Sequence, residues 1–166
     1  MKNFRIFLLI TTLSTFKLVA QEMTPNKLKQ LITQVADTIK TNGNSIQFAY
    51  KETMLIYVFD ENTNRMRIIT PVAKKEDLGQ DELLNALVAN FHSALDVKYA
   101  LSDELIWSVF IHPLREPSDH QVLYAIDQVY SAAVTLGTSY SSTNLVFPGN
   151  TKKKENQKKT FRKTKI

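Results

Sequence analysis

Two long apolar segments constrain the fold of this chain more than any other feature of its sequence. Residues 53–60 read TMLIYVFD, and residues 104–114 read ELIWSVFIHPL. Both are rich in β-branched and aromatic residues and are largely apolar at odd and even positions alike. Because successive side chains of a strand point to opposite faces of a sheet, such segments are typical of interior strands. The sequence therefore predicts a sheet with these two strands inside it, the second ending at Pro113.

Three other segments have the periodicity and end signals of helices. Residues 24–43 begin with Thr24 as a cap and have Gly43 beyond their predicted end. Residues 78–96 form the second helix, and residues 118–137 begin with Ser118 and Gln121 in the spacing of a capping box. We expect these side chains to face inward: Leu28, Leu31, Ile32, Val35, Ala36, Ile39, Leu84, Leu87, Val88, Phe91, Leu95, Val122, Leu123, Ile126, Val129, Tyr130, Ala133 and Val134.

Short turns join the predicted strands into two groups. Residues 45–50, 53–60 and 65–72 follow one another, and residues 97–101 and 105–111 flank the turn sequence SDE. The element order is therefore α-β-β-β-α-β-β-α. We expect an α+β sandwich, in which helices pack on a largely antiparallel five-stranded sheet. A chain of 166 residues has room for one such domain and little more.

The first twenty residues have the pattern of a signal peptide. Lys2 and Arg5 precede an apolar run that begins at Ile6, and Ala20 offers a small residue before a cut. Polar residues from Thr11 onward interrupt that run, which disfavours a membrane anchor. We expect export to the periplasm or the extracellular space after cleavage near Ala20. The alternative is a cytoplasmic protein that keeps its N-terminus.

The positive charge of the chain is concentrated at its two ends. The formal net charge is +5, but residues 21–150 carry ten basic and fifteen acidic residues. Residues 151–166 carry eight basic residues and one Glu, which predicts a disordered basic tail that could touch anionic surfaces. Its single aromatic residue, Phe161, argues against a specific nucleic-acid platform. The candidate contact residues are Lys152, Lys153, Lys154, Lys158, Lys159, Arg162, Lys163 and Lys165.

The residue types and their spacing do not indicate a catalytic site. The chain has no Cys, which excludes disulfides and thiolate nucleophiles, and it has no G-x-S-x-G or phosphate-binding loop. His92, His112 and His120 are not spaced as metal ligands, so we expect no metal, no cofactor and no enzymatic activity. The alternative is an enzyme with an unrecognised site around His112, Arg115 and His120. Phe91, Tyr99, Trp107 and Phe110 are interpreted as core residues rather than pocket walls.

The order of these segments resembles the YbjN-like family. The resemblance rests on RMRIITPV, LLNALVANFHSALDVKYAL, LIWSVFIHPL and LGTSYSS, and it covers roughly residues 24–142. It implies a fold similar to the class I type III secretion chaperones, with a twisted antiparallel sheet. In those chaperones it also implies dimerisation and binding of peptide segments along apolar grooves.

These observations divide the chain into three parts and lead to one main functional expectation. Residues 1–20 are a signal peptide, residues 21–150 a YbjN-like or secretion-chaperone-like domain, and residues 151–166 a basic tail. We expect a non-enzymatic, exported binding or chaperone-like domain. It would contact a protein or peptide through a sheet face or a helix groove, and a homodimer is left open. A second alternative is an electrostatic adaptor that docks on an anionic surface through its Lys-rich tail.

Overall fold

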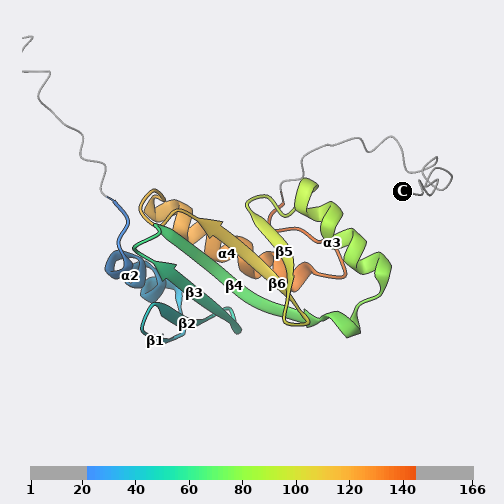
Figure 1. Ribbon diagram of the computed structural model, residues 1–166, viewed down its shortest axis with the longest axis horizontal. Helices are drawn as coiled ribbons and strands as arrows, with labels where there is room; N and C mark the ends of the chain where they lie inside the picture. The colour runs from blue at the N-terminus through green and yellow to red at the C-terminus, as the bar shows by residue number, and fades with distance from the viewer. Residues whose placement is uncertain (1–21, 145–166) are drawn as a thin grey trace, which may run out of the picture.

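A six-stranded antiparallel sheet organises residues 22–144, the part of the chain that this computed structural model describes (Figure 1). The strand order is β1-β2-β3-β4-β6-β5. Three helices pack on the sheet, so the expected α+β class is confirmed, with six strands in place of five. The strands are β1 (Thr38–Asn42), β2 (Ser45–Tyr50), β3 (Thr53–Asp60), β4 (Arg65–Lys74), β5 (Val97–Ser102) and β6 (Leu105–His112). The helices are α2 (Pro25–Val35), α3 (Gln80–His92) and α4 (Asp119–Thr135), and a short 3-10 turn, η1 (Lys75–Asp77), precedes α3.

The additional strand, β1, comes from a segment that the sequence predicted to be helical. The helix α2 ends at Val35, because Ala36 adopts an extended conformation with φ −88° and ψ 136°. β1 then pairs antiparallel with β2 through a two-residue turn at Gly43 and Asn44. Gly43 has φ +55°, so it serves a hairpin turn rather than the end of a helix. Ile39, predicted to face inward, is 38% exposed on this edge strand.

The two apolar segments are interior strands, as predicted. β3 lies between β2 and β4, and β6 lies between β4 and β5. β6 ends at His112, directly before Pro113. Pro71 lies inside β4, where the β4–β6 register shifts between Pro71 and Ala73, and β4 continues to Lys74, two residues beyond its predicted end.

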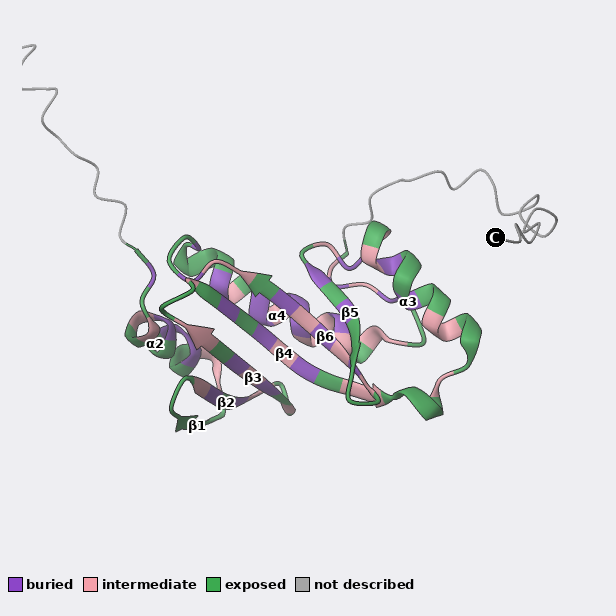
Figure 2. Ribbon diagram, viewed as in Figure 1, coloured by how far each residue is buried: buried purple, intermediate pink, exposed green. Residues whose placement is uncertain are grey.

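One face of the sheet, here called the inner face, carries the hydrophobic core beneath α4. Its fully buried side chains include Phe48, Leu55, Tyr57 and Ile68. α4 contacts β4, β5 and β6, and Ser108 Oγ on β6 donates a 2.9 Å hydrogen bond to the Val129 carbonyl of α4. Figures 1 and 2 view the sheet with α4 behind it, so the opposite, outer face is turned toward the reader.

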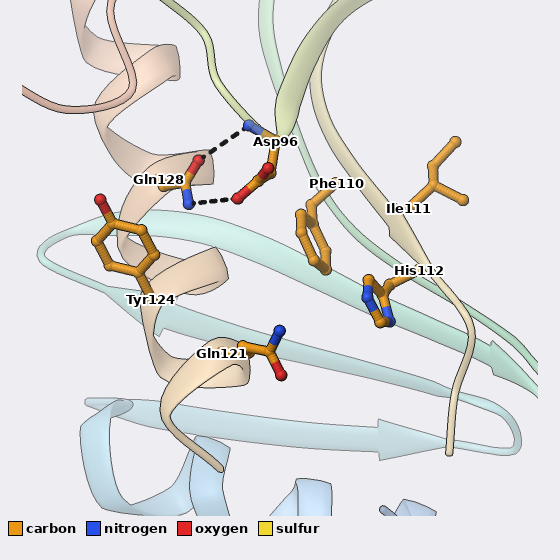
Figure 3. A pocket seen from close by; sticks show the side chains of 7 residues that line it. All are labelled: Asp96, Phe110, Ile111, His112, Gln121, Tyr124 and Gln128. Atoms are coloured by element: carbon orange, nitrogen blue, oxygen red, sulfur yellow. Dashed lines mark hydrogen bonds between the residues drawn. The ribbon is translucent and has the colours of Figure 1, made fainter. Parts of the chain in front are cut away.

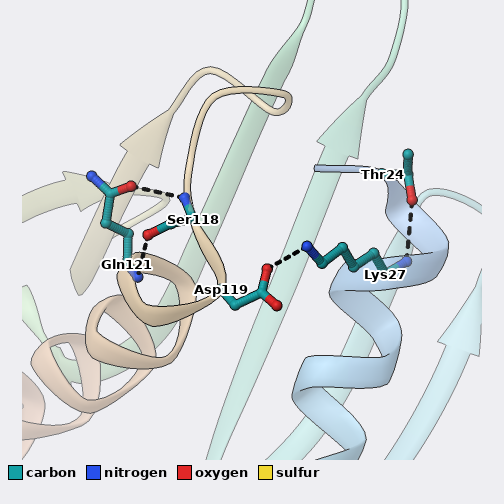
Figure 4. Close-up of polar contacts among 5 residues, drawn as sticks. All are labelled: Thr24, Lys27, Ser118, Asp119 and Gln121. Atoms are coloured by element: carbon teal, nitrogen blue, oxygen red, sulfur yellow. Dashed lines mark hydrogen bonds and ion pairs between the residues drawn. The ribbon is translucent and has the colours of Figure 1, made fainter. Parts of the chain in front are cut away.

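The starts of α2 and α4 are joined by a polar contact (Figure 4). Thr24 caps α2, with the Lys27 N–H donating to its hydroxyl over 3.2 Å. Ser118 and Gln121 form the predicted capping box of α4. Lys27 Nζ lies 2.6 Å from Asp119 Oδ1, which ties the two helix starts together.

The predicted signal peptide, residues 1–20, and the predicted tail, residues 151–166, lie outside the described residues. Within residues 22–144, no helix combines the length and the apolar character that crossing a membrane requires.

Candidate functional site

The outer face of the sheet carries an apolar surface that no described helix covers. Side chains alternate along each strand, so the register pairs of Ile56 with Ile69 and of Ile69 with Val109 place these residues side by side on this face. Met54 is 50%, Val58 37% and Ile111 57% exposed. We call this surface the outer sheet face, defined by Met54, Ile56, Val58, Ile69, Trp107, Val109 and Ile111.

Trp107 belongs to this surface and not to the core. It is half-buried, and its indole N–H donates to the Ser102 carbonyl over 3.1 Å. The interpretation of Trp107 as a buried core residue is therefore wrong. Strand alternation explains the outcome, because the neighbours Ile106 and Ser108 point to the inner face and are buried.

Two arginines border the outer sheet face at one end of β4. Arg67 lies opposite Val58 on β3 and opposite Ile111 on β6, and Arg65 lies opposite Asp60. Asp60 is the one acidic side chain among the strand positions of this face. The hydroxyl and backbone N–H of Thr63 hold the pKa of Asp60 below its ordinary value. The border is thus basic overall, with two guanidinium groups and one carboxylate.

A second apolar surface lies on α3, where the sequence predicted burial. Leu84 is 51%, Leu87 64%, Val88 57% and Phe91 77% exposed, and we call these four residues the α3 apolar face (Figure 2). Ala86 and Ala89, 4% exposed each, face the body of the protein instead. The helix is apolar over a wide arc, so its periodicity could not decide which side packs. The prediction that Leu84, Leu87, Val88 and Phe91 are buried is wrong.

A groove separates α3 from β5. It has a volume of about 270 Å³ and is lined by Leu83, Ala86, Leu87, Tyr99, Ala100, Leu101 and Ile106. The Tyr99 hydroxyl is already used within the protein, because it donates a hydrogen bond to the Ala132 carbonyl over 2.7 Å.

The side chain of Asn90 occupies the free edge of β5 beside this groove. Tyr99 N–H donates to Asn90 Oδ1 over 2.7 Å, and Asn90 Nδ2 donates to the Tyr99 carbonyl over 3.1 Å. Because both backbone groups of Tyr99 are satisfied, a peptide cannot add there as a further strand without displacing the amide.

The histidine singled out from the sequence, His112, lines a separate small pocket between β6 and α4 (Figure 3). The pocket has a volume of about 240 Å³ and is lined by Asp96, Phe110, Ile111, His112, Gln121, Tyr124 and Gln128. His112 Nδ1 lies 2.9 Å from the Pro113 carbonyl, so Nδ1 carries a hydrogen and Nε2 is the acceptor in the neutral ring. Its ring stacks on Phe110 at a centroid distance of 5.7 Å.

The other members of the alternative catalytic site do not line this pocket. Arg115 Nη2 donates to the Glu61 carbonyl over 3.2 Å, away from His112. The His120 ring stacks on Tyr124 at 6.0 Å. Within residues 22–144, no group of three or more His, Asp or Glu is placed to hold a metal ion. The lining of this pocket includes no serine or threonine.

Sequence reasoning missed the polar part of this pocket. Gln128 is 1% exposed on the buried side of α4. It accepts a hydrogen bond from the Asp96 N–H over 3.3 Å and donates to Asp96 Oδ2 over 3.2 Å. The available signal was a glutamine among the inward-facing positions of residues 118–137, because a buried amide needs hydrogen-bond partners.

The candidate contact residues of the basic tail, Lys152 to Lys165, lie outside the described residues. A scan against protein-family models finds no match to this chain. A search of curated proteins finds no match either.

Proposed function

We propose that the protein is a non-enzymatic binding domain that acts outside the cytoplasm and holds a protein partner on its outer sheet face. The observation that carries this proposal is an apolar surface across β3, β4 and β6 with no layer of the described chain on it. Proteins that remain monomeric rarely expose large contiguous apolar patches, so such a patch is typical of an interaction site. Export rests on the pattern of residues 1–20.

The chemistry of the border indicates which partner suits this surface. Arg65 and Arg67 are exposed at one end of it, and neither forms an ion pair within residues 22–144. An amphipathic helix with an apolar stripe and acidic residues beside the stripe would bury the apolar side chains and place its carboxylates near the guanidinium groups. A second copy of the chain would instead bring four arginines and only two carboxylates, those of Asp60, to one interface. We therefore favour an acidic amphipathic segment of another protein.

The resemblance to YbjN-like proteins also supports a binding role. The related secretion chaperones have no catalytic motif and bind peptide segments on apolar surfaces. A six-stranded sheet with helices on one face is compatible with that resemblance.

A catalytic role for His112 is the weaker candidate. Its pocket contains one imidazole and one carboxylate, and Arg115 and His120 contact other groups.

The test uses a designed fluorescent peptide, an amphipathic helix of Leu and Glu, and a matched peptide in which every Glu is Lys. We expect the acidic peptide to bind the protein and the basic peptide to bind at least tenfold more weakly. Ile111→Glu should weaken binding of the acidic peptide at least tenfold. Val134→Glu on α4 is the matched control, since Val134 is 54% and Ile111 57% exposed, and should leave binding unchanged.

Three results would overturn the proposal. The first is equal binding of the acidic peptide to both variants, and the second is no binding to the unaltered protein. The third is a dimer in light scattering that Ile111→Glu converts to a monomer, because a second copy would then cover the outer sheet face.

A further inference from the structure

The α3 apolar face needs a cover that residues 22–144 do not supply. Its four side chains follow the spacing i, i+3, i+4 and i+7 from Leu84, which is the spacing with which one helix face receives a partner. Phe91, the most exposed of them at 77%, lies one residue before the end of the helix.

The described chain ends beside this same helix. Ser142 N–H donates to the Ser93 carbonyl over 3.1 Å, and Ser142 Oγ donates to the Ala94 carbonyl over 2.7 Å. Ser93 Oγ in turn donates to the Tyr140 carbonyl over 2.6 Å. Ser93 directly follows α3, so these bonds hold the chain at the C-terminal end of the helix. Ser142 is two residues before the last described residue, Asn144.

The residues that come next are Leu145, Val146, Phe147 and Pro148. They are an apolar group between the Ser/Thr-rich stretch before them and the Lys-rich tail after them. An extended chain advances roughly 3.3 Å per residue, so three residues can carry the chain at most about 10 Å from Asn144 to Phe147. The last two described residues, Thr143 and Asn144, line a pocket with Tyr124, Asp127 and Ser131 of α4. The segment therefore starts between α4 and the C-terminal end of α3, where Phe91 is two residues before Ser93.

We propose that residues 145–148 of the same chain cover the α3 apolar face, with Phe147 packed near Phe91 and Val88. The occupant of this surface is thus a segment of this protein. The proposal concerns a different surface from the outer sheet face, and it stands or falls independently of the proposed function.

The charge that follows the segment complements the far end of the helix. Asp77 and Asp81 lie at the start of α3, and neither forms an ion pair within residues 22–144. The thirteen residues of α3 span about 20 Å, and the eight residues from Asn144 to Lys152 can span up to about 26 Å. A segment that runs back along the α3 apolar face therefore brings the first lysines of the tail to these carboxylates.

The experiment exploits the absence of Cys from the whole chain. The pair Val88→Cys and Val146→Cys is introduced into the full protein. Disulfide formation in oxidised glutathione is then followed by non-reducing electrophoresis and intact mass at low protein concentration. The matched control pair is Ile111→Cys and Val146→Cys, because Val88 and Ile111 are both 57% exposed. We expect the first pair to close within one molecule at least tenfold faster than the second.

A third protein separates docking from simple proximity. Adding Phe147→Ser to the first pair keeps the length of the segment but removes its largest apolar side chain. Docking predicts that this change slows closure at least fivefold. Three results would overturn the proposal: similar rates for the two pairs, no effect of Phe147→Ser, or a product that links two molecules. The last of these would assign the α3 apolar face to a second copy.

Discussion

Removing the hydroxyl of Tyr57 should stabilise the protein. Tyr57 lies on the inner face of β3, is fully buried, and stacks on Phe59 at a centroid distance of 5.5 Å. Within the described chain, its hydroxyl is the one buried side-chain polar atom without a hydrogen-bond partner. Burial also raises the pKa of Tyr57 above its ordinary value. Tyr57→Phe keeps the packed ring and removes only the hydroxyl.

The size of the effect follows from the cost of an unsatisfied polar group. Burying a hydroxyl without a hydrogen-bond partner costs about 1–3 kcal/mol, which Tyr57→Phe recovers. Part of this gain is lost again, because the missing oxygen leaves a small gap in the packing. We expect the free energy of unfolding to rise by about 1 kcal/mol. Tyr99 provides the control, because its hydroxyl donates to the Ala132 carbonyl over 2.7 Å. Tyr99→Phe removes this hydrogen bond and should lower the free energy of unfolding by about 1 kcal/mol.

Urea denaturation of the three proteins, followed by circular dichroism, measures both changes. The same chemical substitution at two buried tyrosines should thus shift the midpoint in opposite directions. A loss of stability of similar size in both variants would refute the reasoning, because it would show that the Tyr57 hydroxyl has a stabilising partner.

Three further outcomes are expected. Burial raises the pKa of Tyr57 above its ordinary value and raises that of Tyr99 to about 12. The stability that depends on these two tyrosines being neutral is therefore complete below the ordinary tyrosine pKa of about 10, and it is lost as the pH rises toward 12. In urea titrations at several pH values, the free energy of unfolding should fall by about 1.4 kcal/mol per pH unit for each of these tyrosines. Tyr57→Phe should make the slope shallower by about 1.4 kcal/mol per pH unit. Ser118→Ala removes the α4 cap and should lower the free energy of unfolding by about 1 kcal/mol in the same assay. Asn90→Ala frees both backbone groups of Tyr99 and should cost about 1–2 kcal/mol, whereas the exposed Asn85→Ala on the same helix should change stability by less than about 0.5 kcal/mol. Equal costs at the two asparagines would contradict the role of Asn90 at the β5 edge.

Features set by local chemistry could be predicted from the sequence. The caps at Thr24 and Ser118 depend on a side chain and backbone N–H groups three residues away. The end of β6 depends on the missing N–H of Pro113. Each of these interactions lies within a few residues of its cause, so the pattern contains the information that decides it.

The misassigned features depend on contacts between distant parts of the chain. Thr38 to Asn42 continued the helical pattern of α2, yet pairing with β2 makes this segment a strand. The orientation of α3 depends on the packing of Ala86 and Ala89 against the body of the protein. The periodicity of the helix does not show that these two small residues, rather than the four large apolar ones, face inward. The pocket of His112 joins Asp96 to Gln128, thirty-two positions apart. No local pattern contains that contact.

The position of the chain end distinguishes the two exposed apolar surfaces. Hydrogen bonds from Ser142 to the Ser93 and Ala94 carbonyls hold the described chain at the C-terminal end of α3, and the proposed docking of residues 145–148 on the α3 apolar face starts from there. The outer sheet face lies on the side of the sheet away from α4, and none of the described helices covers it. Ile111 therefore serves two tests: a charge there should weaken partner binding at least tenfold, whereas a cysteine there should capture residue 146 at least tenfold more slowly than a cysteine at Val88 does. If the cysteine at Ile111 captures residue 146 as readily as the cysteine at Val88, the C-terminal segment does not prefer the α3 apolar face. The assignment of different occupants to the two surfaces would then be wrong.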